Sequence, residues 1–396
     1  MKKINWFIGL LTALTVTGCS RQQSAESAGP TPIVVDWNYK DLDYSHWVED
    51  SALVVPLETK DDCLIGEITY LVYQDHKIYV ADNVGKAVYV FDEKGKLLSK
   101  LHKVGNGPGE YLEIAAFTVY NSKLLICDMM NRKIFVYHED GTFLYEKDAS
   151  KIWGMEMFCL DNELYLYNDG SHTRMGDYHL FKMNPQEGND EVEASLPFED
   201  SGGWGIQKYS CVNGNEALFT VWPFDMLYRL KDGKATPVYS VDFGDRRLPE
   251  RYFKEEGIEV LRISHKENYI TGIAGVNQSD RYIFLPFFDT NGTSIVIYDK
   301  ATGKTMTAKQ LYNKNIGGLE LLCFGSSPMT YIQNGYILSY RDMEMWVMGA
   351  KAGENWDKRE FTSEYTREKF KELQQMDMEN NPVVIIQKIK EDVTLF

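Results

Sequence analysis

Positive charge, histidine and catalytic motifs are all sparse in this chain of 396 residues. Lysine and arginine number 42 against 58 aspartates and glutamates, which gives a formal net charge of −16. Such a surface repels phosphate backbones and argues against nucleic acid as a partner. The seven histidines are dispersed without His-x-His or His-Glu-x-x-His spacing, and neither Gly-x-Ser-x-Gly nor a Ser/His/Asp grouping occurs. The sequence therefore assigns no catalytic residue, no metal ligand and no particular cofactor.

Cysteine is also uncommon, with six residues of which one is at position 19. The other five are odd in number and widely scattered, and they show neither a disulfide framework nor zinc-ligand spacing. We expect most of them to be small core residues. They are Cys63, Cys127, Cys159, Cys211 and Cys323.

An apolar run from Ile4 to about Val16 lies near the N-terminus, where residues 1–19 read MKKINWFIGLLTALTVTGC. It is too short to span a bilayer, and two lysines before an apolar stretch are typical of an export signal. Its end, Val16-Thr17-Gly18-Cys19, resembles a lipobox. That resemblance implies a lipoprotein signal peptide at residues 1–18 and lipidation of Cys19, which would anchor the protein in a membrane. An ordinary signal peptide with a chance cysteine is the alternative.

Residues 19–32 are rich in Ser, Gln, Ala, Gly and Pro and have little to bury. We expect a flexible tether that holds the globular part off the membrane. Ser20 resembles an outer-membrane sorting signal, and no acidic run follows that would resemble a surface-export signal. The expectation is an outer-membrane lipoprotein on the periplasmic side rather than on the cell surface.

The chain does contain an internal repeat, because residues 65–101 align without a gap on residues 111–147. Each copy divides into four short strands, predicted at 67–73, 77–81, 87–92 and 96–102 and at 113–119, 123–127, 133–138 and 142–147. Four antiparallel strands at a period of 46 residues are typical of a β-propeller blade. Eight identities support the alignment: Glu67/Glu113, Ile68/Ile114, Lys77/Lys123, Asp82/Asp128, Val90/Val136, Glu93/Glu139, Gly95/Gly141 and Leu98/Leu144.

A single blade cannot bury both of its faces, so a ring of blades must follow. We predict an all-β fold, a six-bladed β-propeller of four-stranded antiparallel blades over residues 33–396, with seven blades as the alternative. Further blades are expected at 155–196, 208–243 and 269–311 and from Leu319 onward, with a partly helical insertion at 244–268 and a helical segment near 362–378. Strand 53–57 is expected to close the ring beside strand 383–389.

Three pieces of the chain carry a resemblance to a known family. They are the GNGPGEY block of Gly105–Tyr111, VVPLET of Val54–Thr59 with Ile65–Ile68 after it, and the closing NPVV of Asn381–Val384. Together they resemble the six-bladed β-propeller lipoproteins related to NHL repeats. The resemblance implies an exported bacterial envelope protein and brings no agreed catalytic residues.

Candidate ligand-binding residues lie in loops expected on one face of the ring. Lys86 and Arg132 end second-to-third strand turns and could recognise carboxylate or phosphate. Gly107, Gly109 and Glu110 belong to an interblade loop whose amides could approach an anion, although a tight turn that needs positive φ explains the same glycines. Asp82 and Asp128 are expected to cap backbone amides rather than to bind ligand.

Other candidates come from the later blades. His172 and Arg174 belong to a polar cluster in which Asp169, His172 and Asp177 could bind a metal or share a proton, with a polar hairpin as the alternative. Aromatic rings near predicted loops could stack on sugars, or they could be core residues. They are Trp153, Trp204 and Trp222.

Three functions stay open from these observations. The first is a binding or scaffolding module for a glycan, peptide or envelope protein. The second is a metal-assisted lyase or hydrolase at the mouth of the central channel, and the third is a structural subunit of an envelope complex.

Overall fold

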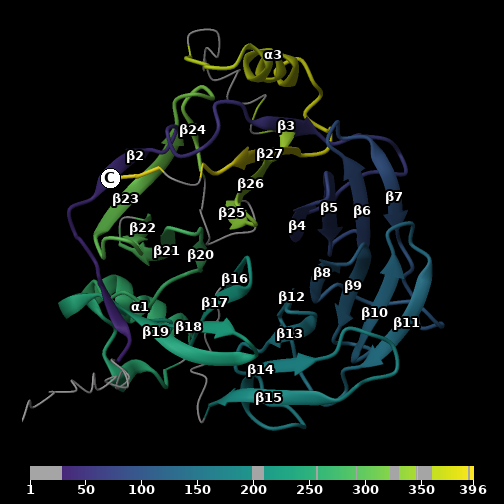
Figure 1. Ribbon diagram of the computed structural model, residues 1–396, viewed down its shortest axis with the longest axis horizontal. Helices are drawn as coiled ribbons and strands as arrows, with labels where there is room; N and C mark the ends of the chain where they lie inside the picture. Colours follow the sequence, from purple (N-terminus) through teal and green to yellow (C-terminus); the bar gives the residue numbers. More distant parts are fainter. Residues whose placement is uncertain are drawn as a thin grey trace, which may run out of the picture.

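Strands dominate the computed structural model, which describes residues 29–198, 209–255, 257–290, 292–321, 330–344, 346, 359–390 and 393–396. They form six sheets arranged as a ring (Figure 1). Blade one is β4 Tyr70–Gln74, β5 Lys77–Asp82, β6 Ala87–Asp92 and β7 Leu97–Leu101. Blade two is β8 Ala116–Tyr120, β9 Lys123–Asp128, β10 Lys133–His138 and β11 Phe143–Asp148. Blade three is β12 Glu156–Leu160, β13 Glu163–Tyr167, β14 Tyr178–Met183 and β15 Val192–Pro197.

The other three blades carry additions to this pattern. Blade four is β16 Ser210–Asn213, β17 Glu216–Val221, β18 Met226–Lys231 and β19 Lys234–Asp242. Blade five is β20 Asn277–Gln278, β21 Tyr282–Asp289, β22 Gly292–Asp299 and β23 Thr305–Asn313, with β24 Leu319–Glu320 paired to β23. Blade six is β25 Thr330–Gln333, β26 Tyr336–Arg341, β27 Val383–Lys388 and β3 Leu53–Pro56. The prediction of six four-stranded antiparallel blades is confirmed.

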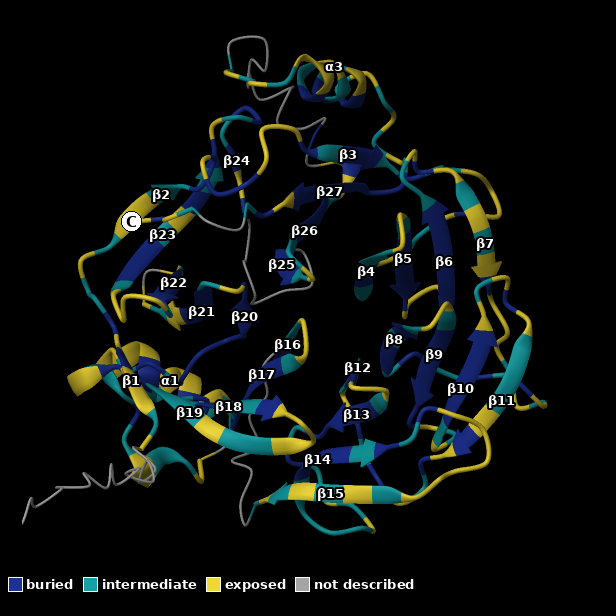
Figure 2. Cartoon of the chain, in the orientation of Figure 1, coloured by how far each residue is buried: buried dark blue, intermediate teal, exposed yellow. Residues whose placement is uncertain are grey.

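Strands inside a blade are apolar at successive positions because both of their faces are buried (Figure 2). In β5, Ile78 and Val80 pack toward blade six, whereas Tyr79 and Ala81 pack toward blade two. Alternate side chains of a strand point to opposite faces, so each blade contributes to two interfaces. The hydrophobic core is therefore a series of clusters between neighbouring blades.

Tight turns set the register of the first two strands in several blades. Both central residues of these turns have positive φ, as type I′ hairpins require. The turns are Asp75-His76, Asn121-Ser122, Asp161-Asn162 and Asn334-Gly335.

The ring closes by pairing strands from both ends of the chain. β3 pairs antiparallel with β27, with Val383 opposite Pro56 and Ile386 opposite Leu53. This is the closure that the sequence predicts. The predicted start of blade six near Leu319 is wrong, because Leu319 lies in β24, which hydrogen-bonds to β23 of blade five.

Two further N-terminal strands run along the outside of the ring. β1 Thr31–Val34 pairs parallel with β19, and β2 Lys40–Asp43 pairs parallel with β23. Between them the Trp37 ring lies under the Arg246 guanidinium at 4.4 Å, and the Tyr39 hydroxyl donates to Asp289 at 2.6 Å. We call residues 31–43 the strap; its first strand begins two residues before the predicted start of the propeller.

Helices occur only in the two long connections among the described residues. The β19–β20 connection contains η1 Gly244–Arg246, η2 Glu250–Tyr252 and α1 Gly257–Glu267. The β26–β27 connection contains α3 Glu364–Leu373, whose N-cap Ser363 accepts a hydrogen bond from the Thr366 amide. Both lie where the sequence predicts helix, and no described helix is long and apolar enough to cross a membrane.

The strap should contribute to stability through one side chain of β1. Ile33 is fully buried against blades four and five, whereas its neighbour Val34 is 54% exposed. We expect Ile33→Ala to lower the free energy of unfolding by about 2–4 kcal/mol. Val34→Ala should change it by less than about 0.5 kcal/mol. Denaturant unfolding of both variants checks this, and equal effects would mean that the strap does not pack as described.

Candidate functional site

Two kinds of connection meet on one face of the ring because successive strands of a blade run in opposite directions. They are the loops between blades and the turns from the second to the third strand of each blade. We call this face the interblade face, and the opposite one, made by the other hairpins, the hairpin face. All described candidates from the sequence lie in connections of the interblade face: Lys86, Gly107, Gly109, Glu110, Arg132, Trp153, His172, Arg174 and Trp222. Cys19 and Trp204 lie outside the described residues.

Buried aspartates hold the connections of the first two blades in place. Asp82 is fully buried and accepts hydrogen bonds from the amides of Gly66, Glu67 and Gly85 at 2.7, 3.2 and 2.8 Å. Asp128 accepts from Leu112 and Asn131 in the same way, at 2.7 and 2.9 Å. Each carboxylate ties the loop that enters its blade to the turn inside that blade, so the two aspartates act as caps.

The glycine-rich loop is likewise held by its own side chains. Glu110 accepts a hydrogen bond from the Gly107 amide at 2.9 Å. Gly109 has φ +69°, and a Cβ there would lie 2.6 Å from the Phe143 ring. The Tyr111 hydroxyl donates to the Lys86 carbonyl at 2.8 Å. The Glu110 carboxylate thus already accepts the hydrogen bond that the Gly107 amide would donate to a bound anion. This favours the interpretation of the glycines as parts of a tight turn rather than of an anion site.

Three cations converge at the junction of blades two and three. The Arg132 guanidinium donates to the Ser150 carbonyl at 3.4 Å, and the Met175 amide, next to Arg174, donates to the Lys151 carbonyl at 3.0 Å. All three side chains are exposed, and none forms an ion pair with a described carboxylate. We call Arg132, Lys151 and Arg174 the cation cluster.

Asp148 is the acidic group beside this cluster. Hydrogen bonds from Ser150 hold the pKa of its carboxyl below the usual value, and the charges of Lys151 and Arg174 lower that pKa further. The carboxylate is therefore ionised at neutral pH and offsets one of the three positive charges.

Lys86, the candidate cation of blade one, is exposed in the turn between the second and third strands of that blade. Sequence reasoning missed Lys151, because this lysine lies in a loop between blades and belongs to no motif.

The described candidate tryptophans pack against protein rather than form open platforms. Trp222 makes edge contacts with Phe224 and Phe253, each with ring centroids 5.4 Å apart. Trp153 is half-buried against the core between blades two and three. Both rings therefore fit the interpretation as packing residues better than the interpretation as sugar-stacking platforms.

The polar cluster of blade three divides into an exposed and a buried part. His172 lies exposed, with Nδ1 2.9 Å from the Asp177 carboxylate, while Asp169 accepts from Ser171. His179 is buried; its ring lies 4.6 Å from the Phe198 ring, and its Nδ1 lies 3.1 Å from the Asn168 carbonyl. Among the described residues no three His, Cys, Asp or Glu side chains gather in a way that could hold a metal ion.

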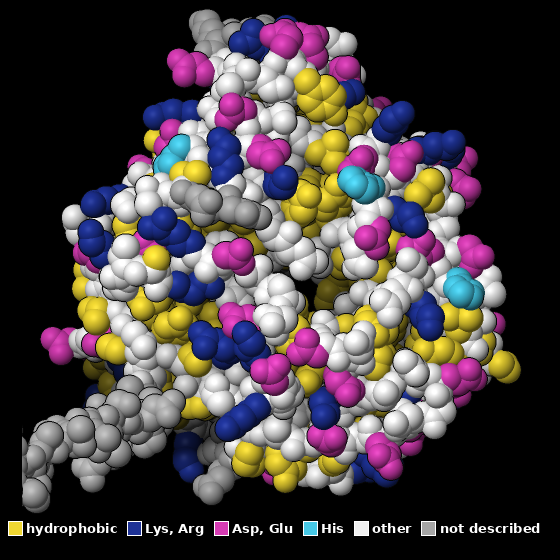
Figure 3. Space-filling view, viewed as in Figure 1, with side chains coloured by type: hydrophobic (Ala, Val, Ile, Leu, Met, Phe, Trp, Pro, Cys, Tyr) yellow, Lys and Arg dark blue, Asp and Glu magenta, His cyan; other side chains and the backbone are white. Residues whose placement is uncertain are grey.

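Exposed apolar side chains recur along five consecutive connections of the interblade face, from the entry to blade one to the entry to blade three. Each connection presents one large hydrophobic residue: Leu64, Val84, Val104, Met130 and Met155. Met130 and Val84 are 68% and 66% exposed. The described hairpins of the hairpin face present none. In Figure 3, which shows one face of the ring, charged side chains of both signs surround the central hollow.

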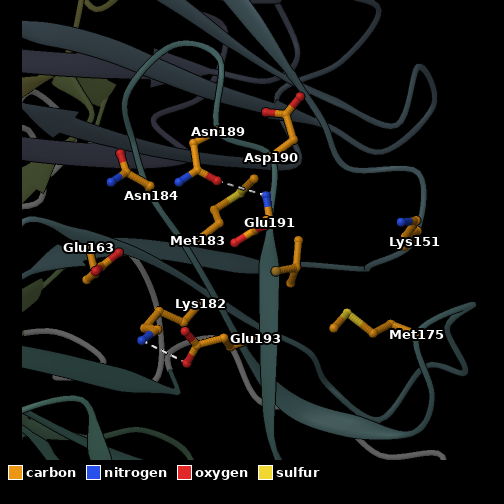
Figure 4. A pocket seen from close by; sticks show the side chains of 11 residues that line it. Lys151, Glu163, Met175, Lys182, Met183, Asn184, Asn189, Asp190, Glu191 and Glu193 are labelled. Atoms are coloured by element: carbon orange, nitrogen blue, oxygen red, sulfur yellow. Dashed lines mark hydrogen bonds and ion pairs between the residues drawn. The ribbon is translucent and has the colours of Figure 1, made fainter.

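A groove of about 660 Å³ lies beside the outer strand of blade three (Figure 4). Lys151 of the cation cluster and Met175 line it on one side. Elsewhere its lining is mainly acidic, with one lysine and four carboxylates: Lys182, Glu163, Asp190, Glu191 and Glu193. Lys182 and Glu193 pair with each other at 2.8 Å. The buried Lys147 ammonium donates to the carbonyls of Gln186 and Asn189, which holds the neighbouring hairpin in position.

Blade count, closure and site geometry define the class: a six-bladed β-propeller with its candidate binding residues on the interblade face. Residues 33–388 match the model of a domain of unknown function, DUF4934, and the chain belongs to that family. No functionally curated protein matches the sequence.

Two crystal structures from Bacteroides are similar to this chain. A Bacteroides fragilis protein that carries the provisional name of an exported protein is 19% identical, with a TM-score of 0.69 over 91% of this chain and 100% of that one. A Bacteroides vulgatus member of the DUF4221 family is 13% identical, with a TM-score of 0.48 over 87% of this chain and 97% of that one. The first similarity supports the fold. The relation to NHL repeats stays a prediction.

Replacing a capping aspartate should weaken blade one. In Asp82→Asn the amide nitrogen would face backbone N–H groups that now donate to a carboxylate oxygen. We expect a loss of about 2–3 kcal/mol in the free energy of unfolding, because a buried donor loses its acceptor. Asn83→Asp, at the exposed neighbour, is the control for denaturant unfolding. An unchanged midpoint in Asp82→Asn would contradict the capping role.

Burial of His179 should make the protein sensitive to mild acid. Desolvation lowers the pKa of its imidazole below the usual value, while Asn168 and Asp169 act in the opposite direction. The unfolded chain then binds a proton near pH 6.5 that the folded chain does not, so stability should fall as the pH drops through about 6.5. His179→Gln should flatten this dependence, and His172→Gln should not. Thermal melts across pH 5 to 8 check both, and parallel profiles for all three proteins would contradict the prediction.

Proposed function

We propose that this β-propeller is a binding module of the cell envelope whose interblade face, over blades one to three, binds a protein partner. The observation that carries the proposal is the row of exposed apolar side chains on five consecutive connections, which the hairpin face lacks among the described residues. Water-exposed apolar groups in a row gain free energy when a partner covers them. The fold supplies rigid strands that hold these connections in fixed positions.

A protein partner fits the face better than a glycan. Sugar recognition would use open aromatic rings, and Trp153 and Trp222 are instead packed against neighbouring side chains. Exposed methionine and valine side chains with cations between them are suited to a protein surface that combines apolar and charged groups. The metal-assisted lyase or hydrolase has no corresponding support among the described residues.

The cellular address belongs to the same proposal. The apolar run ending at Cys19 supports export and lipid attachment, and the Ser20 signal supports the periplasmic side of the outer membrane. The partner would then be another envelope protein within reach of the tether at residues 19–32.

Site-specific photocrosslinking in the producing cell tests the proposal. A photoreactive residue placed at Val84, Met130 or Met155 should give a discrete adduct with one protein. The same residue at Leu98, which is 50% exposed on β7 but outside these connections, is the matched control and should give none. Met130→Asp should reduce the adduct formed from position 84, because it places a charge within the apolar row.

Adducts of equal yield from Leu98 and from the interblade positions would contradict a preferred face. Absence of any adduct from all three interblade positions would contradict partner binding there.

A further inference from the structure

The cation cluster extends the proposed binding face to its edge at blade three. Arg132 comes from the turn of blade two, Lys151 from the loop between blades two and three, and Arg174 from the turn of blade three. Two backbone hydrogen bonds bring these segments together: the Ala149 amide donates to the Arg132 carbonyl at 2.9 Å and the Met175 amide to the Lys151 carbonyl at 3.0 Å. Their convergence is thus part of the fold and does not depend on side-chain positions alone.

Local charge balance leaves this cluster positive. Asp148 is the acid beside it, and its carboxylate accepts from the Ser150 amide at 2.8 Å. Glu146, the next acid along β11, pairs with Lys133 at 2.5 Å. Many other cations of the protein are paired with carboxylates, as in Lys77–Glu139 and Arg281–Asp299. Three cations without an ion pair to a described carboxylate lie on adjoining segments, and Asp148 offsets only one of their charges. The positive charge that remains gains from an external anion.

We propose that Arg132, Lys151 and Arg174 bind a carboxylate-rich, acidic peptide segment of the protein partner. The proposal rests on the proposed function and names the chemistry of its partner. Carboxylates match this site because an arginine guanidinium can form two parallel hydrogen bonds to one carboxylate, in bidentate geometry. Exposed Met130 and Met155 stand in the same connections, so the segment carries apolar residues between its acids.

Fluorescence anisotropy with the full chain, purified in a non-ionic detergent, tests this assignment. The probe is a labelled peptide of four Glu-Ser-Leu repeats, and the matched neutral peptide has Gln in place of Glu. We expect the acidic peptide to bind at least about tenfold more tightly than the neutral one and to weaken as NaCl is added. Combined Arg132→Gln, Lys151→Gln and Arg174→Gln should lower its affinity by about tenfold or more.

A second triple variant controls for net charge. Lys94→Gln, Lys96→Gln and Lys304→Gln remove three exposed lysines from the hairpin face and should leave the affinity unchanged. Thermal melts of both triple variants should match that of the parent protein, since all six side chains are exposed.

Several results would overturn the assignment. These are equal affinity for the acidic and neutral peptides, equal losses in the two triple variants, or displacement of the peptide by inorganic phosphate at an ionic strength at which NaCl leaves it bound. Preferential binding of the parent protein, but not of the cluster variant, to phosphatidylglycerol vesicles over phosphatidylcholine vesicles would assign the cluster to a membrane surface instead. If the crosslinks from Val84 and Met130 persist while the acidic peptide fails to bind, the binding face stands and the acidic segment is wrong.

Discussion

Closure of the ring is the constraint on which the rest of the structure depends. Each blade has two apolar faces, as the side chains of β5 show by packing toward blade six and blade two at alternate positions. A row of such blades leaves two faces in water until its ends meet. The pairing of β3 with β27 brings the ends together, and Val54 and Ile385 in that pair are both buried. The pairing thereby holds the two ends of the chain together, and every blade face packs against a neighbouring blade.

The strap adds a second hold on the same ring. β1 and β2 each extend an outer strand in parallel, so blades four and five have edges that are covered, while β7, β11 and β15 end their sheets. Trp37 and Tyr39 lie against Arg246, Phe287 and Asp289, which fixes the path between the two strands. The strap, from Thr31 onward, therefore lies on the outer wall of the ring.

Capping and binding make different demands on the charged groups of the interblade face. Asp82, Asp128 and Glu110 accept hydrogen bonds from backbone amides of their own connections, which stabilises the loops. The cations of the cluster are instead exposed to water, and Arg132 also donates to the Ser150 carbonyl. At the junction of blades two and three, the exposed Arg132, Lys151 and Arg174 outnumber the exposed Asp148 and give a locally positive surface on an acidic protein. The exposed apolar side chains beside it complete the surface proposed to bind a partner.

Much of the fold could be predicted from the sequence, because the pattern that encodes a blade is local and repeated. Strand periodicity, turn residues such as Asn334-Gly335 and the helix cap Ser363 all act within a few residues of one another. The strap could not be predicted, since its four-residue strands pair at exposed edges and leave little apolar pattern. The same holds for the candidate site: sequence alone identified Arg132 and Arg174 as separate candidates and missed Lys151. Only the tertiary structure decided that these three cations meet and that Trp153 and Trp222 are packing residues, because contacts between separate loops depend on how the blades are placed around the ring.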